Sequence, residues 1–250
     1  ISDDTLTPVV AECDDSRLND IQGRHVTEQD IVQALDQAHD GPVPEGSVGA
    51  GTGMISYGFK GGIGTSSRRL SEREGGYTVG VLVNANHGRR SELVVNGIPV
   101  GRVYDRESAS LGRRDQGAAI PGQGDGSIIV VIATDAPLDS RQLTRIAKRA
   151  AIGLARTGST IRHGSGDFML AFSTANVIPH YPDAPTFTLT HLADPYLNPL
   201  FAATAEATEE AILNALTTAT TSVGRDGRRV EALSLSRLRE LMDSPVPASP

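Results

Sequence analysis

The run from Ser127 to Thr134, Ser-Ile-Ile-Val-Val-Ile-Ala-Thr, constrains the fold of this chain more than any other feature. Such a continuous β-branched run is typical of a strand that is covered on both faces. The residues before it, 105–126, hold Gly, Arg, Asp, Gln and Pro without periodicity, and they predict an exposed loop. The chain therefore delivers a hydroxyl residue, Ser127, from a glycine-rich loop to the first position of a buried strand.

Periodic segments on both sides of this strand predict the remaining elements. Strands are expected over 77–84, 168–173 and 187–190, together with a hairpin over 91–103 that turns at Asn96-Gly97. Helices are expected over 27–39, 139–154, 199–220 and 235–241, with helix-capping residues at Thr27 and Asp139. This mixture predicts an α+β domain with helices outside stacked sheets.

Length, charge and cysteine content exclude several classes of function. A chain of 250 residues can bury a substantial core as one large domain or two small ones. The net charge of −7 argues against general nucleic-acid binding, which needs a basic face. One cysteine, Cys13, excludes an internal disulfide framework and leaves the cytoplasm as the default compartment, with the periplasm still open. No HExxH or CxxC array and no membrane-spanning apolar run occurs, so neither a metal nor a membrane partner is expected.

Two glycine-rich runs, 46–54 and 59–67, could be phosphate-binding loops. A dinucleotide-binding loop follows a strand and opens a helix, and neither context is predicted here. The sequence therefore disfavours a nucleotide site, and no cofactor is expected.

The junction between Gly126 and Ser127 indicates a specific chemistry. Glycine lets the backbone adopt a conformation in which the Ser127 hydroxyl attacks the preceding carbonyl, and hydrolysis of the resulting ester frees the Ser127 α-amine. An α-amine titrates near pH 8, so it can act as general base beside its own hydroxyl. The alternative is that Gly-Ser simply ends a loop, and the junction alone leaves that alternative open.

Two other segments place polar groups next to predicted strands. In 163–174, Ser165 and Asp167 are separated by two residues and face the same way if extended, so they can converge on the amine-bearing nucleophile. Asn84 and Asn86 end another strand, where a side-chain amide can donate to a developing oxyanion. Taken alone, the first pattern also fits a turn and the second an Asx turn.

Seven segments occur in the order found in the L-aminopeptidase/D-esterase (DmpA) family, which includes the β-aminopeptidases. They cover nearly the whole chain: Pro8-Val-Val-Ala-Glu12, Leu18-Asn-Asp-Ile21, 45–54, 60–68, Val83-Asn-Ala-Asn-His-Gly88, Gly126-Ser127 and 164–174. The chain resembles that family on these segments. The resemblance implies a self-cleaving serine aminopeptidase or amidase that removes amino-terminal residues from small peptides, amides or esters.

The resemblance also implies an architecture. Residues 1–126 would be the C-terminal part of an α chain whose upstream part is missing here, and 127–250 would be the β chain. Together they would form one domain, a four-layer αββα sandwich like that of N-terminal-nucleophile hydrolases with different connectivity. The two chains would stay associated after cleavage and assemble into an oligomer of αβ units.

Carried over by position, Ser127 resembles the family's nucleophile, and Ser165 and Asp167 resemble its Ser and acidic partners. Asn86 resembles the oxyanion-hole asparagine, with Asn84 as the second candidate for that role and a candidate substrate-binding residue.

Two residues depart from the family pattern. Asp167 stands where β-aminopeptidases often carry Glu. Asp14, a candidate substrate-binding position, stands where some members carry Tyr, and an ionised carboxylate cannot assist an oxyanion. A non-catalytic relative, or an acyltransferase on the same scaffold, is therefore kept as an alternative, although such acyltransferases usually expose Thr at the nucleophile position.

Overall fold

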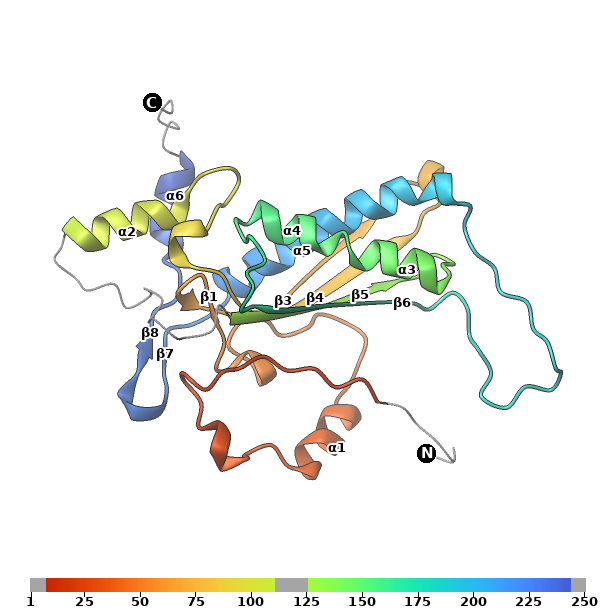
Figure 1. The fold of residues 1–250 in the computed structure, drawn as a ribbon, viewed down its shortest axis with the longest axis horizontal. Helices are drawn as coiled ribbons and strands as arrows, with labels where there is room; N and C mark the ends of the chain where they lie inside the picture. The colour runs from red at the N-terminus through yellow and green to blue at the C-terminus, as the bar shows by residue number, and fades with distance from the viewer. Residues whose placement is uncertain (1–7, 111–125, 244–250) are drawn as a thin grey trace.

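A four-stranded sheet forms the centre of the computed structural model, which describes residues 8–110 and 126–243 (Figure 1). Its strands are β3 (Gly62–Arg69), β4 (Thr78–His87), β5 (Gly126–Thr134) and β6 (Gly166–Ser173), in the order β3-β4-β5-β6. The β3–β4 and β4–β5 pairs are antiparallel and the β5–β6 pair is parallel. This mixed sheet with its helices confirms the predicted α+β class.

Three helices cover one face of the sheet: α3 (Ser140–Ala147), α4 (Ala150–Arg156) and α5 (Asn198–Thr217) (Figure 1). Successive strand residues point to opposite faces, so every second residue of β4 and β5 lies under these helices. Those residues are fully or almost fully buried: Val79, Val81, Val83 and Ala85 in β4, and Ile128, Val130 and Ile132 in β5. The apolar run that begins at Ser127 therefore supplies one of the two central strands of the sheet.

Helix α5 lies very close to β3 because both elements have small residues where they meet. A Cβ on Gly64 would lie 1.9 Å from the carbonyl oxygen of Ala211. This distance is too short for any residue with a side chain at position 64. At the other end of the contact, Arg68 forms ion pairs with Glu206 and Glu210 of α5. A glycine and an ion-pair network together fix the helix along the strand.

The second face of the sheet is only partly covered, which corrects one expectation. On β6 the side chains of Phe168, Leu170 and Phe172 are 66%, 42% and 44% exposed, and β5 alternates between buried and half-buried residues. Neither strand is therefore buried on both faces. The described residues form two of the four expected layers, one of helices and one sheet, while the segment that carries α1 (Glu28–Asp36) crosses the open face (Figure 1).

The remaining elements surround the ends of this sheet. They are the strands β1 (Ile55–Ser56), β2 (Phe59–Lys60), β7 (Ser222–Val223) and β8 (Arg229–Val230), the helices α2 (Val100–Ser110) and α6 (Leu235–Asp243), and the 3-10 turns Ile21–Gly23, Gly49–Gly51, Glu72–Glu74, Arg90–Glu92, Asp194–Leu197 and Arg225–Gly227. Strands β1 and β2 pair with each other, as do β7 and β8.

Both predicted helix caps are confirmed. Thr27 caps α1 in a capping box with Asp30, and Asp139 caps α3 in a capping box with Gln142. The single helix expected over 139–154 is wrong in one respect, because it is interrupted at residues 148–149 and continues as α4.

Two strand predictions are wrong. The hairpin over 91–103 is reduced to one bridge between Val95 and Ile98, because Val94 donates its backbone NH to Thr157 and the chain enters α2. Residues 105–110, expected to be loop, belong to that helix, and 111–125 lie outside the described residues.

The short strand over 187–190 does not form. The amide of Asn176 instead binds both the NH and the carbonyl of Thr190.

Candidate active site

Gly126, the first residue of β5, occupies a conformation that only glycine adopts easily. Its φ is +84°, and a Cβ there would lie 2.1 Å from the carbonyl oxygen of Asn86. Both observations explain why the residue before Ser127 is a glycine, whereas cleavage at this bond stays a prediction.

Ser127 lies between two strands on the open face of the sheet. It pairs with Asn86 of β4 and Gly166 of β6. Its neighbour Ile128 points into the helix-covered core, so alternation directs the Ser127 side chain to the opposite face, where it is half-buried. A Cβ on Gly166 would lie 3.8 Å from the Ser127 Cβ. The ring of Phe168 lies over the same position, 3.4 Å from where that Cβ would be, so a side chain at residue 166 would contact both Ser127 and Phe168.

Asn86 is held rigidly next to Ser127. Its Oδ1 accepts from the backbone NH of Ile55 at 2.8 Å, and its Nδ2 donates to the backbone carbonyl of Asp14 at 2.9 Å. An amide Nδ2 has two hydrogens, so one remains for a further acceptor. Asn86 is 7% exposed, and its two contacts fix the direction of that second hydrogen.

Asn84 lies two residues earlier on the same face of β4, opposite Ile129. Its side chain is 7% exposed, and its Oδ1 has no hydrogen-bond partner among the described residues. A buried acceptor without a partner is unfavourable. Asn84 therefore stays a candidate for substrate contact.

Ser165 and Asp167 meet as their spacing predicts. The Ser165 hydroxyl donates to Asp167 Oδ1 at 2.5 Å. Asp167 pairs with Ile128 and thus faces the helix side, whereas the Ser127 hydroxyl faces the other side. The Ile128 backbone NH also interacts with the Asp167 carboxylate, which places that carboxylate beside the main chain one residue after Ser127. A free Ser127 α-amine would lie along this main chain.

Burial raises the pKa of Asp167, while the hydrogen bonds from Ser165 and from the Ile128 NH act against that rise. Asp167 Oδ2 has no hydrogen-bond partner among the described residues. The carboxylate can therefore still accept a hydrogen bond from an added donor such as an ammonium group.

Comparison of the whole sequence with protein families identifies one family. The profile of peptidase family S58 matches residues 1–230. The chain belongs to peptidase family S58.

Three proteins of known name or structure are similar to the chain. The beta-peptidyl aminopeptidase BapA of Sphingosinicella xenopeptidilytica is 44% identical over 247 residues, which is 97% of this chain and 61% of that relative. A solved structure from Pyrococcus horikoshii OT3 matches with a TM-score of 0.84 at 46% identity, covering 97% of this chain and 64% of its own. The L-aminopeptidase D-Ala-esterase/amidase of Ochrobactrum anthropi matches with a TM-score of 0.79 at 41% identity, covering 91% of this chain and 60% of its own.

The last of these structures is described as a prototype for the serine aminopeptidases and a new variant among the Ntn hydrolase fold. The family and the fold variant inferred from the sequence are therefore confirmed. The chain spans 61% of the length of the BapA relative, so it corresponds to part of that protein.

Asp14 contacts the candidate site through its main chain. Its carbonyl oxygen orients Asn86, whereas its exposed carboxylate accepts from the backbone NH of Ser16 at 2.9 Å. The contact to Asn86 is available to any residue type at position 14. An aspartate at position 14 is therefore compatible with this contact to Asn86.

Lys60 explains the two glycine-rich runs better than a phosphate does. Its ammonium group is fully buried and donates to the carbonyl oxygens of Gly51 and Gly61 at 2.8 and 2.9 Å. A phosphate-binding loop points NH groups at its ligand, whereas these loops point carbonyls at a cation. Burial lowers the pKa of Lys60 to about 8, and Asp15 opposes that shift. The disfavoured nucleotide alternative therefore receives no support here.

His87 is a buried residue that the sequence did not single out, although it directly follows Asn86. It pairs with Gly126, is 1% exposed, and contacts the Tyr57 ring edge-on at a centroid distance of 5.0 Å. Burial lowers the pKa of His87 to about 4, so it is neutral at pH 7. The uncharged His87 ring is thus buried at the position of β4 that pairs with Gly126.

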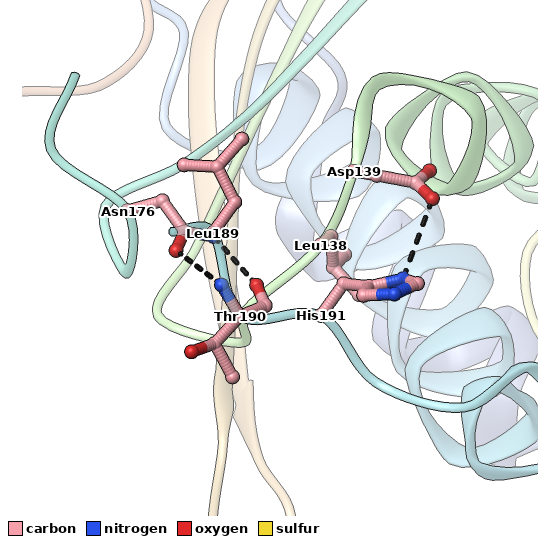
Figure 2. A pocket seen from close by; sticks show the side chains of 6 residues that line it. All are labelled: Leu138, Asp139, Asn176, Leu189, Thr190 and His191. Atoms are coloured by element: carbon pink, nitrogen blue, oxygen red, sulfur yellow. Dashed lines mark hydrogen bonds and ion pairs between the residues drawn. The ribbon is translucent and has the colours of Figure 1, made fainter. Parts of the chain in front are cut away.

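A pocket elsewhere on the molecule lies far from these groups. Figure 2 shows its lining residues, Leu138, Asp139, Asn176, Leu189, Thr190 and His191. They follow the C-terminal ends of β5 and β6, whereas Ser127 begins β5, seven residues or about 23 Å away along the strand. Within 8–110 and 126–243, no group of His, Cys, Asp and Glu side chains is arranged to hold a metal ion, and no helix is long and apolar enough to cross a membrane.

Proposed function

We propose that this chain carries the active site of a self-processing serine aminopeptidase. It breaks the bond between Gly126 and Ser127 and then uses Ser127 as an N-terminal nucleophile. The observation that carries the proposal is the position of Ser127, beside the fixed Asn86 amide of β4 and next to Ile128, whose backbone interacts with the Asp167 carboxylate.

Self-cleavage needs a hydroxyl next to a strained or accessible carbonyl. The Ser127 Oγ attacks the Gly126 carbonyl carbon, and the C–N bond breaks as the proton moves to the departing nitrogen. Water then hydrolyses the ester, leaving a Gly126 carboxylate and a free Ser127 amine and hydroxyl. Glycine adopts the positive φ of Gly126 without strain, so the step relies on the Ser127 hydroxyl reaching the Gly126 carbonyl rather than on a strained peptide bond.

Hydrolysis of a substrate uses the amine that this cleavage frees. The neutral α-amine accepts the Ser127 hydroxyl proton as the oxygen attacks the substrate carbonyl. The free hydrogen of Asn86 Nδ2 donates to the oxyanion, and the ammonium returns the proton to the departing amine. Water then releases the acyl group by the same route in reverse.

The substrates are proposed to be small peptides, amides or esters with a free amino end. This rests on the relatives, one named a beta-peptidyl aminopeptidase and another an L-aminopeptidase D-Ala-esterase/amidase. A panel of glycyl, D-alanyl and β-alanyl p-nitroanilides with the full-length protein tests it. Hydrolysis of at least one is expected, and a split protein that hydrolyses none would contradict the aminopeptidase proposal.

The two chains, 1–126 and 127–250, are proposed to stay together as one domain and to assemble into oligomers of αβ units. Cleavage would break the covalent link between the part of the chain with β3 and β4 and the part with β5 and β6. The two parts would stay joined by hydrogen bonds, because β4 and β5 pair over nine residues. Helix α5 of the second chain also packs on β3 and β4 of the first. The sheet and the core thus hold the chains in place.

Asp167→Asn should lower kcat by about 10²-fold, in the range of general acid–base effects, and should move the rising limb of the pH–rate profile to lower pH. Free α-amines titrate at about 7.7–8.0, and a neighbouring carboxylate favours the ammonium form. Removing that charge lowers the amine pKa, so the base becomes neutral at lower pH.

The full pH–rate profile of p-nitroanilide hydrolysis measures this shift. Asp135→Asn is the matched control, because Asp135 is an exposed carboxylate just after the far end of β5. It should move neither kcat nor the limb. An Asp167→Asn protein that loses stability but keeps its pH profile would assign Asp167 a structural role.

A further inference from the structure

The segment 161–165, which leads into β6, begins with an isoleucine in an unfavourable backbone conformation. Ile161 has a φ of +49°, in the left-handed region that a β-branched residue avoids. Its side chain is 41% exposed, so burial of that side chain does not explain the conformation. Such strain persists only where the surrounding contacts impose it. Ser165 of the proposed site is the last residue of this segment.

The neighbour of this isoleucine, Arg162, is fixed by an ion pair with Glu92. Arg162 Nε donates to Glu92 Oε1 at 3.1 Å, and a terminal guanidinium nitrogen donates to the same oxygen. The other oxygen, Glu92 Oε2, accepts from the backbone NH of Arg89 at 3.1 Å. The Glu92 side chain is 15% exposed, so solvent screens this pair less than it screens a fully exposed pair. Arg162 is therefore held at one position relative to residues 89–92.

Two further hydrogen bonds connect Arg162 to the proposed site. The Arg162 carbonyl accepts from the backbone NH of Ser165 at 3.0 Å. The Ser165 hydroxyl in turn donates to Asp167 Oδ1 at 2.5 Å. A shift of Arg162 would therefore move the Ser165 main chain and weaken the contact of its hydroxyl with Asp167.

Residues 92–94 also support the start of the loop between α4 and β6. Val94 donates its backbone NH to the carbonyl of Thr157 at 3.0 Å, and a Cβ on Gly158 would lie 1.8 Å from the carbonyl oxygen of Glu92. Glu92 and Val94 belong to 1–126, whereas the loop belongs to 127–250. After the proposed cleavage, these contacts would join the two chains.

We propose that Glu92 and Arg162 are positioning residues, whose ion pair holds the segment 161–165 in its strained conformation and so keeps the Ser165 hydroxyl on Asp167. This rests on the proposed function, because Ser165 and Asp167 belong to the proposed site. Glu92 and Arg162 exchange no proton and form no bond in the reaction. The first chain would thereby orient a hydroxyl of the second, where a displacement of about 1 Å can lower a rate about 10²-fold.

Arg162→Gln in the full-length protein should lower kcat for p-nitroanilide hydrolysis about tenfold or more, because the segment can then relax away from Asp167. Ile161→Gly tests the strain directly, since glycine adopts a positive φ without cost. In the Ile161→Gly protein, adding Arg162→Gln should lower kcat less than about threefold, because the segment no longer needs the ion pair to keep its conformation. Each kcat is expressed per split chain, and denaturing electrophoresis measures the amount of split chain.

Arg68→Gln is the matched control. The Arg68 side chain is 34% exposed, close to the 33% of Arg162, and its ion pairs with Glu206 and Glu210 also connect 1–126 to 127–250. Arg68 lies at the end of β3 that is remote from Ser127. Its substitution should therefore lower the thermal unfolding midpoint without changing kcat.

Two results would overturn the proposal: an Arg162→Gln protein with a kcat within about twofold of the wild type, or equal losses of kcat with and without Ile161→Gly. An equal loss of kcat in Arg68→Gln would also overturn it, because the effect would then come from general destabilisation. A wild-type protein that neither splits nor hydrolyses amides would instead count against the proposed function, which keeps the two failures distinct.

Discussion

Ser127→Ala is expected to yield one unsplit chain and to lower amide hydrolysis on the order of 10⁶-fold, as the loss of a serine nucleophile does. The alanine lacks the oxygen that attacks the Gly126 carbonyl, so the α-amine is never freed. The protein then lacks both its nucleophile and its base. Denaturing electrophoresis and p-nitroanilide hydrolysis measure the two effects in one preparation.

The fold should survive this change. Ser127 is half-buried, and a smaller apolar side chain at the start of β5 leaves the buried face of that strand untouched. Ser67→Ala is the matched control, because Ser67 is an exposed serine in β3 of the same sheet. It should split and hydrolyse normally. Substantial hydrolysis by the Ser127→Ala protein would rule out Ser127 as nucleophile.

Asn86→Ala is expected to lower kcat by about 10²- to 10³-fold, as for other oxyanion donors. The Asn86 amide also forms hydrogen bonds to the backbone of Ile55 and of Asp14, which stabilise the fold. Its loss should therefore destabilise the fold as well. Steady-state kinetics and thermal unfolding of the same protein measure both effects.

Asn176 offers a matched control for this second effect. Its amide also makes two backbone hydrogen bonds, both to Thr190, but near the other end of the sheet (Figure 2). Asn176→Ala should lower the unfolding midpoint, though by less than Asn86→Ala because its bonds are exposed, and should leave kcat unchanged. An unchanged kcat in Asn86→Ala would move the oxyanion role to Asn84 or to backbone NH groups, and Asn84→Ala would then be the variant to measure.

Local patterns in the sequence predicted much of the fold because they depend on near neighbours. The β-branched run after Ser127 does form a central strand, and the capping boxes at Thr27 and Asp139 do begin helices. The spacing of Ser165 and Asp167 likewise sufficed to bring their side chains together. Each of these features involves residues only a few positions apart.

Features that depend on distant residues could not be predicted in this way. The contacts of Cys13 with Asn84 and of Asn86 with Asp14 join residues 71 and 72 positions apart. Lys60 inside a glycine-rich run gave no sign that the carbonyls around it would bind its ammonium. The exposed aromatic face of β6 has the same apolar composition as a buried strand, so the sequence alone predicted burial.

N-terminal sequencing of the separated chains of the purified full-length wild-type protein tests self-cleavage at Ser127. After denaturation, two chains are expected, the second beginning Ser-Ile-Ile-Val at Ser127. Their intact masses should add up to that of the precursor plus one water. A single uncleaved chain that hydrolyses peptide amides at full rate would show that Ser127 does not act as an N-terminal nucleophile.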